Sequence, residues 1–365
     1  MKPSRMLGFA RKEVLEIIRD PITVFISLVM PLIMLFLFGY AMSFDVEDAP
    51  LYIIDHDRSA ASRALADQFV NTPYFELAGA PDDERVGEHA LMEGRARAVL
   101  SIPPHFGRRL ARGEVSPVEF VVDGTYASTA AIVSAYGRAI IYSFPRGTLE
   151  LQVRPEVRVW YNPQLRSRDF IIPGLFAVIM MAFPPMLTAL AVAREKELGT
   201  IAQIFASPLT KAEFIIAKLA PYAAIAFVQL AIVLAGGFLW FKVPMHGSLA
   251  LLVGLGLIYV LTTVSIGLLV STLVRTQVAA MLVTLILTLM PSFLFSGFIF
   301  PIFTMPEFFQ GYSARIPTMY FVNISRGIVM RGAGLAELWF NVAVLVGYTA
   351  VVLVAATLLF RKRIG

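Results

Sequence analysis

The residue types that most often do chemistry are few and scattered in this sequence. The four histidines stand singly, and none has the spacing of a metal-binding motif; they are His56, His89, His105 and His246. Cysteine is absent, which excludes disulfide bonds and thiolate metal or redox sites. The sequence also lacks a G-x-x-x-x-G-K-[S/T] phosphate loop, the commonest ATP-binding cradle. We therefore expect no catalytic residue, metal site or cofactor in this chain.

One charged segment interrupts two long apolar runs and is the strongest candidate for a functional surface. Residues 193–214 read AREKELGTIAQIFASPLTKAEF. Acidic side chains open the segment, a Gly-Thr pair offers a helix start, apolar side chains follow, and a Ser-Pro pair ends the turn. We expect the carboxylates of Glu195 and Glu197 to face the cytoplasm. The residues singled out are Glu195, Glu197, Gly199, Thr200, Phe205 and Pro208.

Composition places this segment in a membrane protein. The chain has 365 residues, of which 57% are hydrophobic and only 16% are charged, and its mean hydropathy is +0.71. A helix needs about 20 mainly apolar residues to cross a bilayer. We therefore predict an α-helical polytopic membrane protein with six transmembrane helices. The six stretches that qualify are Ile22–Met42, Ile171–Ala193, Ile215–Phe241, Leu249–Val274, Val278–Phe300 and Leu338–Phe360.

Lysine and arginine flank these predicted spans on one side of the membrane. They precede the first span, follow the second and the fourth, and close the chain, so the positive-inside rule puts both termini in the cytoplasm. The formal net charge of +5 reflects this topology, and no nucleic-acid partner is needed to explain it. The residues concerned are Lys2, Arg5, Arg11, Lys12, Arg19, Arg194, Lys196, Lys211, Arg275, Arg361, Lys362 and Arg363.

The polar block after the first span is predicted to be an inserted extracytoplasmic α/β domain. Strand-like and helix-like pieces alternate along it, including a strand LYIID (51–55), a long helix over about 126–151 and a strand VRVWYNP (157–163). The whole chain then divides into a cytoplasmic amphipathic helix at 1–20, transmembrane helix 1 at 21–43, the extracytoplasmic domain at 44–169, and transmembrane helices 2–6 at 170–365. The last part contains a cytoplasmic loop at 194–214 and an outer re-entrant region at 296–335.

The predicted spans have no charged residue in their middle, because Lys218 lies near an inner end and Asp169 at an outer boundary. An ion-coupled carrier usually needs an ionisable group at membrane depth, so this absence weighs against such a carrier. The spans offer methionine, phenylalanine and uncharged hydroxyls instead. These side chains suit amphipathic ligands, although ordinary helix packing uses them too. The candidate wall positions are Met181, Phe183, Met186, Thr284, Thr288 and Phe293.

Five stretches together resemble the ABC-2 type transporter permease family, in the branch with a large extracytoplasmic domain after the first span. They occur in the expected order from one end of the chain to the other, which makes the resemblance specific. They are DHDRSAASR (55–63), FVVDGTYAS (120–128), YNPQLRSRDFIIPGL (161–175), AREKELGTIAQIFASPLTKAEFIIAKLAPY (193–222) and SGFIFPIFTMPEFFQGYSARIPTMYFVNISRGIVMRGAG (296–334).

The resemblance implies the membrane subunit of an ATP-driven exporter of drugs or other amphipathic compounds in a bacterial inner membrane. It implies that a separate ATPase subunit binds ATP and Mg, and that the segment 193–214 carries a short coupling helix that docks on this subunit. It also implies a dimer, of this chain or with a similar permease, with the substrate path between the second and fifth spans of facing subunits. A periplasmic adaptor is a further candidate partner.

Two other functions stay open on the sequence alone. A membrane receptor or scaffold would bind a ligand or an envelope partner through its outer domain without transport. An ion-coupled carrier would require an essential charge within the membrane. Nucleotide-driven change in the membrane helices distinguishes the exporter from the receptor or scaffold.

Overall fold

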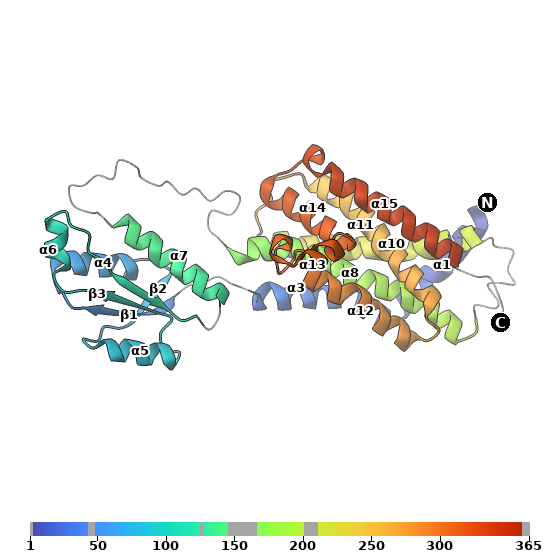
Figure 1. Ribbon diagram of the computed structural model, residues 1–365. Coiled ribbons are helices and arrows are strands. Elements are labelled where there is room, and N and C mark those ends of the chain that lie inside the picture. The colour runs from blue at the N-terminus through green and yellow to red at the C-terminus, as the bar shows by residue number, and fades with distance from the viewer. Residues whose placement is uncertain (1–2, 43–47, 125–126, 145–165, 201–210, 360–365) are drawn as a thin grey trace. The chain divides into compact units, whose positions relative to one another are not determined.

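The computed structural model describes residues 3–42, 48–124, 127–144, 166–200 and 211–359 (Figure 1). It divides into two compact units. One unit comprises Met1–Ser43 together with Trp160–Gly365, and the other comprises Phe44–Val159. The first unit is helical and the second contains a small sheet, and each is described by itself.

Within the described residues, six helical segments are long and apolar enough to cross a membrane, which confirms the predicted number. The first runs over Pro21–Ala41 and is built from α2 (Pro21–Val24), the π-helical turn η1 (Phe25–Val29) and α3 (Met30–Ala41). The others are α8 (Ser167–Glu197), α10 (Lys211–Ala235) continued by the π-helical turn η2 (Gly236–Trp240), α11 (Leu249–Leu273), α12 (Gln277–Phe295) and α15 (Leu335–Leu359).

The boundaries of α8 and α12 differ from the prediction by several residues. The helix α8 extends beyond both ends of the predicted span at 171–193, because helical geometry continues into polar residues that hydropathy excludes. The helix α12 ends at Phe295 and not at residue 300. Gly297 has φ +77°, a left-handed conformation that glycine adopts without steric cost and that turns the chain out of the helix.

Within the described residues, four further helical elements belong to this unit. They are α1 (Pro3–Arg19), the short 3₁₀ turn η3 (Ile302–Thr304), α13 (Glu307–Ser313) and α14 (Pro317–Arg331). The helix α1 packs against α10 at the end of the unit where α15 finishes, which we call the α1 end, and α13 lies toward the other, the α13 end (Figure 1). The elements η3, α13 and α14 lie within the region 296–335, and α14 packs against α8 and α15.

The core of the helical unit is built around α8. Nearly every side chain between Ile171 and Ala193 is buried, as expected for a helix that is apolar all round. The helix packs most extensively along α12 and α11. Gly267 on α11 allows a close approach, since a Cβ there would lie 2.2 Å from the Pro185 carbonyl oxygen.

A proline distorts the first span, and a glutamine on another helix compensates for it. Pro31 has no N–H, so it cannot donate to the Ser27 carbonyl four residues earlier. The Gln229 side-chain amide on α10 donates to that carbonyl instead, with Nε2 2.5 Å from the oxygen. The buried Gln229 side chain therefore braces η1 against α10.

The second unit alternates strands and helices: β1 (Ala49–Asp55), α4 (Ala60–Val70), β2 (Phe75–Gly79), α5 (Glu84–Met92), β3 (Ala98–Ile102), α6 (Phe106–Ala111), β4 (Glu119–Val122) and α7 (Ala127–Ser143). The sheet order is β2-β1-β3-β4. The strand β1 pairs in parallel with β2 and β3, placing Leu51 beside Ala98, while β4 runs antiparallel to β3.

Helices cover both faces of this sheet. On one face Leu51 and Leu100 pack with Phe69 of α4 and Val133 of α7, and on the other face Tyr52 and Val99 pack with Ala90 of α5. This alternation follows from the two-residue period of a strand. The sequence analysis did not predict the strand β2. Of the long helix predicted over 126–151, the described part ends at Ser143, and the strand predicted at 157–163 lies outside the described residues.

Candidate coupling site and substrate path

The opening residues of the predicted coupling segment form the C-terminal end of α8. Leu198 caps the helix, and Gly199 follows it with φ +73°. A glycine in this conformation directly after a helix is a common stop signal, so Gly199 ends α8. The helix predicted to start at Gly199 and Thr200 would occupy residues from 201 on, which lie outside the described residues. The Thr200 hydroxyl donates to the Glu195 carbonyl over 3.3 Å. Phe205 and Pro208 lie outside the described residues.

Glu195 takes part in a buried ion cluster that joins three helices. Lys218 of α10 places Nζ 2.9 Å from Glu195 Oε1 and 2.8 Å from Glu13 Oε2 on α1. Lys12 of α1 adds a second ammonium 3.4 Å from Glu195 Oε1, and Glu16 lies 3.1 Å from Lys12. Glu13 and Lys218 are 0% and 1% exposed, so the centre of this ion cluster is buried, whereas Lys12 and Glu16 lie at its exposed edge.

The ion cluster corrects the expectation that both carboxylates of the segment face a cytoplasmic partner. Glu195 is buried, because the Lys218 ammonium inside the protein needs an opposite charge close by. Burial also raises the pKa of the Glu13 carboxyl, and the Lys218 ammonium acts in the opposite direction. Glu197 is exposed, as predicted.

Three neighbouring residues tie the end of α8 to other helices. Arg194 Nη1 donates to Asp20 Oδ2 over 2.9 Å, and Asp20 is the N-cap of α2. Lys196 donates to the carbonyls of Ser271 and Val274 at the end of α11. The Glu197 carboxylate accepts the backbone N–H of Gln277 over 2.8 Å at the start of α12. The contacts of Lys196 and Glu197 match the polarity of the helix ends, because the cation lies at the C-terminus of α11 and the anion at the N-terminus of α12.

The last turn of α8 is thus linked to α1, α2, α10, α11 and α12 at the α1 end. Such a turn can pass a displacement to several helices at once, because each link is a charge-assisted hydrogen bond or ion pair. One carboxylate oxygen from each of Glu13, Glu16 and Glu195 lies within 4.8 Å of the other two, a spacing that could hold a metal ion. Two ammonium groups already occupy this space, so the group fits an ion-pair network better than a metal site.

Two α12 residues of the predicted substrate path, Thr284 and Thr288, belong to a buried row of hydroxyls. Each hydroxyl donates to the carbonyl four residues earlier, as Thr284 does to Ala280 over 2.6 Å and Thr288 to Thr284 over 2.7 Å. Small side chains at this spacing let two helices approach closely, and α12 packs along α8. We call Thr284, Thr288, Ser292 and Ser296 the hydroxyl row.

The α8 residues of the predicted path are also buried in this chain. Met181, Phe183 and Met186 belong to the main apolar core, and Phe293 of α12 is partly buried against it, 4.9 Å from the Phe38 ring. One chain therefore packs all six candidate positions against its own helices. Their role as a path wall between two subunits stays a prediction.

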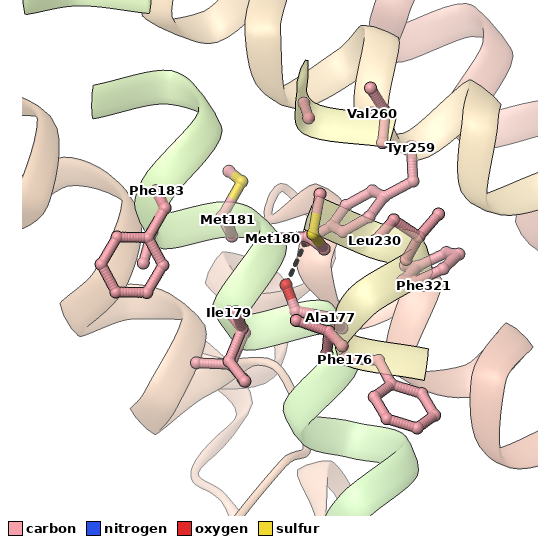
Figure 2. Packing of buried hydrophobic residues seen from close by; sticks show 14 of the residues in the cluster. Phe176, Ala177, Ile179, Met180, Met181, Phe183, Leu230, Tyr259, Val260 and Phe321 are labelled. Carbon is pink, nitrogen blue, oxygen red and sulfur yellow. Dashed lines mark hydrogen bonds between the residues drawn. The ribbon is translucent and has the colours of Figure 1, made fainter. Parts of the chain in front are cut away.

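A second hydroxyl chain crosses the same core. Figure 2 shows the Tyr259 hydroxyl of α11 directed at the Ala177 carbonyl of α8, 2.9 Å away, with the Phe321 ring stacked on Tyr259 at 4.2 Å. The Tyr259 hydroxyl also lies 3.2 Å from Thr318 Oγ1 on α14, which is 2.7 Å from Ser292 Oγ of the hydroxyl row. These bonds satisfy polar atoms that would be costly to bury alone.

The chain is similar to known proteins over nearly its whole length. The family described as ABC-2 family transporter protein matches residues 21–358, so the chain belongs to the ABC-2 transporter family. This confirms the resemblance found in the sequence. In Escherichia coli, the probable multidrug ABC transporter permease YbhS is 31% identical over 367 residues, which cover 98% of this chain and 97% of that protein. The probable multidrug ABC transporter permease YbhR is 32% identical over 368 residues, 99% of each chain. The inner membrane transport permease YhhJ is 32% identical over 332 residues, 87% of this chain and 86% of that protein.

Sequence reasoning missed the ion cluster and the brace on the first span. The sequence does contain a sign of both features, because Lys218 and Gln229 are polar residues within an apolar helix. A polar side chain in such a helix needs a partner. The partners Glu13 and Ser27 lie far away in the sequence, so only the fold identifies them.

Proposed function

We propose that this chain is the membrane permease subunit of an ATP-binding cassette exporter in a bacterial inner membrane. In this proposal a separate ATPase subunit binds and hydrolyses ATP with Mg, and this chain moves amphipathic compounds outward. Membership of the ABC-2 transporter family and the printed names of the three relatives support the transport role. Six apolar helices support the membrane location.

The observation that carries the coupling role is the set of links made by the last turn of α8. We propose that the ATPase subunit docks beside this turn, on the segment 194–214. A push on α8 would reach α1 and α10 through Lys218, and α12 through Glu197. The exposed Glu197 and the turn around Gly199 belong to the described part of this docking surface.

Orientation and assembly belong to the same proposal. The positive-inside rule favours a cytoplasmic α1 end, which puts both termini inside and the α/β unit on the extracytoplasmic side. A dimer, of this chain or with a similar permease, would place α8 and α12 near the substrate path, as the family resemblance implies. The α/β unit is the candidate surface for a periplasmic adaptor.

Reconstitution tests this function. The chain and its ATPase subunit are placed together in proteoliposomes, and ATP-dependent movement of a fluorescent cationic amphipathic dye is measured. We expect dye movement away from the ATPase side, and none with an ATPase subunit whose catalytic residue is removed. Dye movement that persists without ATP and follows an imposed ion gradient would contradict the proposal and favour a carrier.

A further inference from the structure

Arg326 on α14 joins two other segments near the α13 end of the helical unit. Its guanidinium donates three hydrogen bonds to main-chain carbonyls: Nε to Phe170 over 3.1 Å, Nη1 to Gly297 over 2.7 Å and Nη2 to Phe298 over 2.8 Å. Phe170 lies in the first turn of α8, whereas Gly297 and Phe298 directly follow α12. The planar guanidinium presents its N–H donors in a fixed fork that spans these three carbonyls, whereas a lysine ammonium would gather all of its donors at one point.

The surroundings of the guanidinium are shaped for it. The Arg326 Cζ atom lies 3.6 Å from the centroid of the Phe170 ring and 5.9 Å from that of Phe298, both within range of a cation–π interaction. Gly174 leaves the necessary room, since a Cβ there would lie 2.6 Å from the Phe298 ring and 2.9 Å from Arg326 Nη2. The neighbouring Ser325 hydroxyl donates to the Pro173 carbonyl over 2.7 Å, so α14 is fastened to α8 at two adjacent residues.

These contacts lie where the hydroxyl row ends. Ser296 is the last member of the row, and the next two residues supply the carbonyls that bind Arg326. The final carbonyls of a helix and of the turn after it lack partners within the helix, and a cation near them is favourable. Arg326 thus fixes the chain that leaves α12 against the start of α8.

We propose that Arg326 is a positioning residue that closes the α13 end of the hydroxyl row. The Arg326 clasp consists of Arg326, Phe170, Gly297 and Phe298, and it keeps solvent and solutes away from Ser296. Its meaning for transport rests on the proposed function, in which the row forms part of the substrate path. The closure itself does not depend on that function and is measured without the ATPase subunit.

Thiol labelling of the full chain in membranes tests the closure. The chain has no cysteine, so Ser296→Cys introduces a single reporter at a buried position. We expect slow reaction of this thiol with a small maleimide. Adding Arg326→Gln should raise the labelling rate about tenfold, because hydrogen bonds from a charged group are among the stronger ones and local opening limits access. Phe303→Cys, which replaces a side chain 82% exposed, should react equally fast with and without Arg326→Gln.

A second variant separates the clasp from general loosening of α14. Ile328 is buried on the same helix and outside the clasp, so Ile328→Ala weakens packing but leaves the guanidinium contacts in place. We expect Ile328→Ala to leave the Ser296→Cys labelling rate unchanged. Equal acceleration by Ile328→Ala, or no acceleration by Arg326→Gln, would overturn the proposal.

Chemical rescue adds a readout that a purely structural role would not move. Millimolar guanidinium should slow the Ser296→Cys labelling again in an Arg326→Ala background, because the rings and carbonyls of the clasp accept a planar cation. Ethylammonium at the same concentration should not, and Arg326→Lys should not restore slow labelling. Failure of rescue by guanidinium would contradict the assignment. Slow labelling in a chain that exports nothing would leave the clasp intact and count against the proposed function alone.

Discussion

Lys218 of α10 and Glu195 of α8 form a buried ion pair, with Nζ of the lysine 2.9 Å from Oε1 of the glutamate. The same ammonium holds Glu13 of α1, so one cation bridges three helices at the α1 end. Charges buried in this way are costly to separate, and a helix that moves must carry its partners with it. This pair is the structural basis for assigning the last turn of α8 to coupling.

Removal of the Lys218 charge should destabilise the protein strongly. Lys218→Met leaves Glu13 and Glu195 buried without this counter-charge, and breaking a buried pair in this way costs about 3–5 kcal/mol. Adding Glu13→Met should recover most of the loss, because Lys12 then balances Glu195. Thermal unfolding in nanodiscs measures the stability of the single and the double variant. Arg19→Met is the control, because it removes an exposed charge and should change stability little. A double variant as unstable as Lys218→Met alone would refute this account of the ion cluster.

The brace on the first span predicts an unusual coupling between two substitutions. Gln229→Leu should cost about 1–2 kcal/mol, because the Ser27 carbonyl loses its donor. Pro31→Ala restores a backbone N–H four residues after Ser27. In the Pro31→Ala background, Gln229→Leu should therefore cost clearly less. A double-mutant cycle by thermal unfolding checks this, and strictly additive losses would show that the two residues do not share this carbonyl.

The predicted substrate path is tested by adding bulk. Thr288→Trp should abolish dye export in the reconstituted system, because indole does not fit between α8 and α12 where Thr288 is buried. Val351→Trp on α15 should leave export unchanged, since that side chain is 69% exposed and a lipid-facing position accommodates it. ATPase binding should be the same in both variants. Normal export with Thr288→Trp in a folded protein would remove the hydroxyl row from the path.

The α/β unit should fold without the helical unit. It has its own core and a four-stranded sheet covered on both faces, and no disulfide is needed. A soluble fragment of residues 44–159 should show a helix-and-strand circular-dichroism spectrum with cooperative thermal unfolding. Phe69→Ala should destabilise the fragment by about 3–5 kcal/mol, because this fully buried ring contacts Phe75 and Phe120. A fragment that unfolds without cooperativity would contradict its independence.

Sequence patterns predicted the elements far better than the contacts between them. The six spans followed from the length of the apolar runs, and most strands and helices of the α/β unit followed from alternation and turn residues. The strand β2 was missed because FELAG is short and mostly exposed, so it has little apolar signal. Hydropathy also does not reveal that α12 ends at Phe295, because residues 296–300 are still mostly apolar although the chain turns at Gly297.

Glu195 and Glu197 in the predicted coupling segment show that local sequence patterns do not predict long-range contacts. Charge alone suggested that Glu195 and Glu197 are equivalent, both exposed and both facing a partner. Their side chains point to different surroundings because they are two residues apart on a helix, and only Glu195 meets Lys218. A pairing over that sequence distance depends on how α1, α8 and α10 pack, which local sequence patterns do not encode.

Site-specific photocrosslinking at Leu198 tests the central claim most directly. Leu198 caps α8 and is 64% exposed, so a photoreactive amino acid there samples whatever docks beside the last turn. We predict a covalent adduct with the ATPase subunit in membranes that contain both chains, and no adduct from the same photoreactive residue at Phe303, which belongs to η3 near the α13 end. An adduct at Phe303 but none at Leu198 would contradict the assignment of this turn as the site where the ATPase subunit acts.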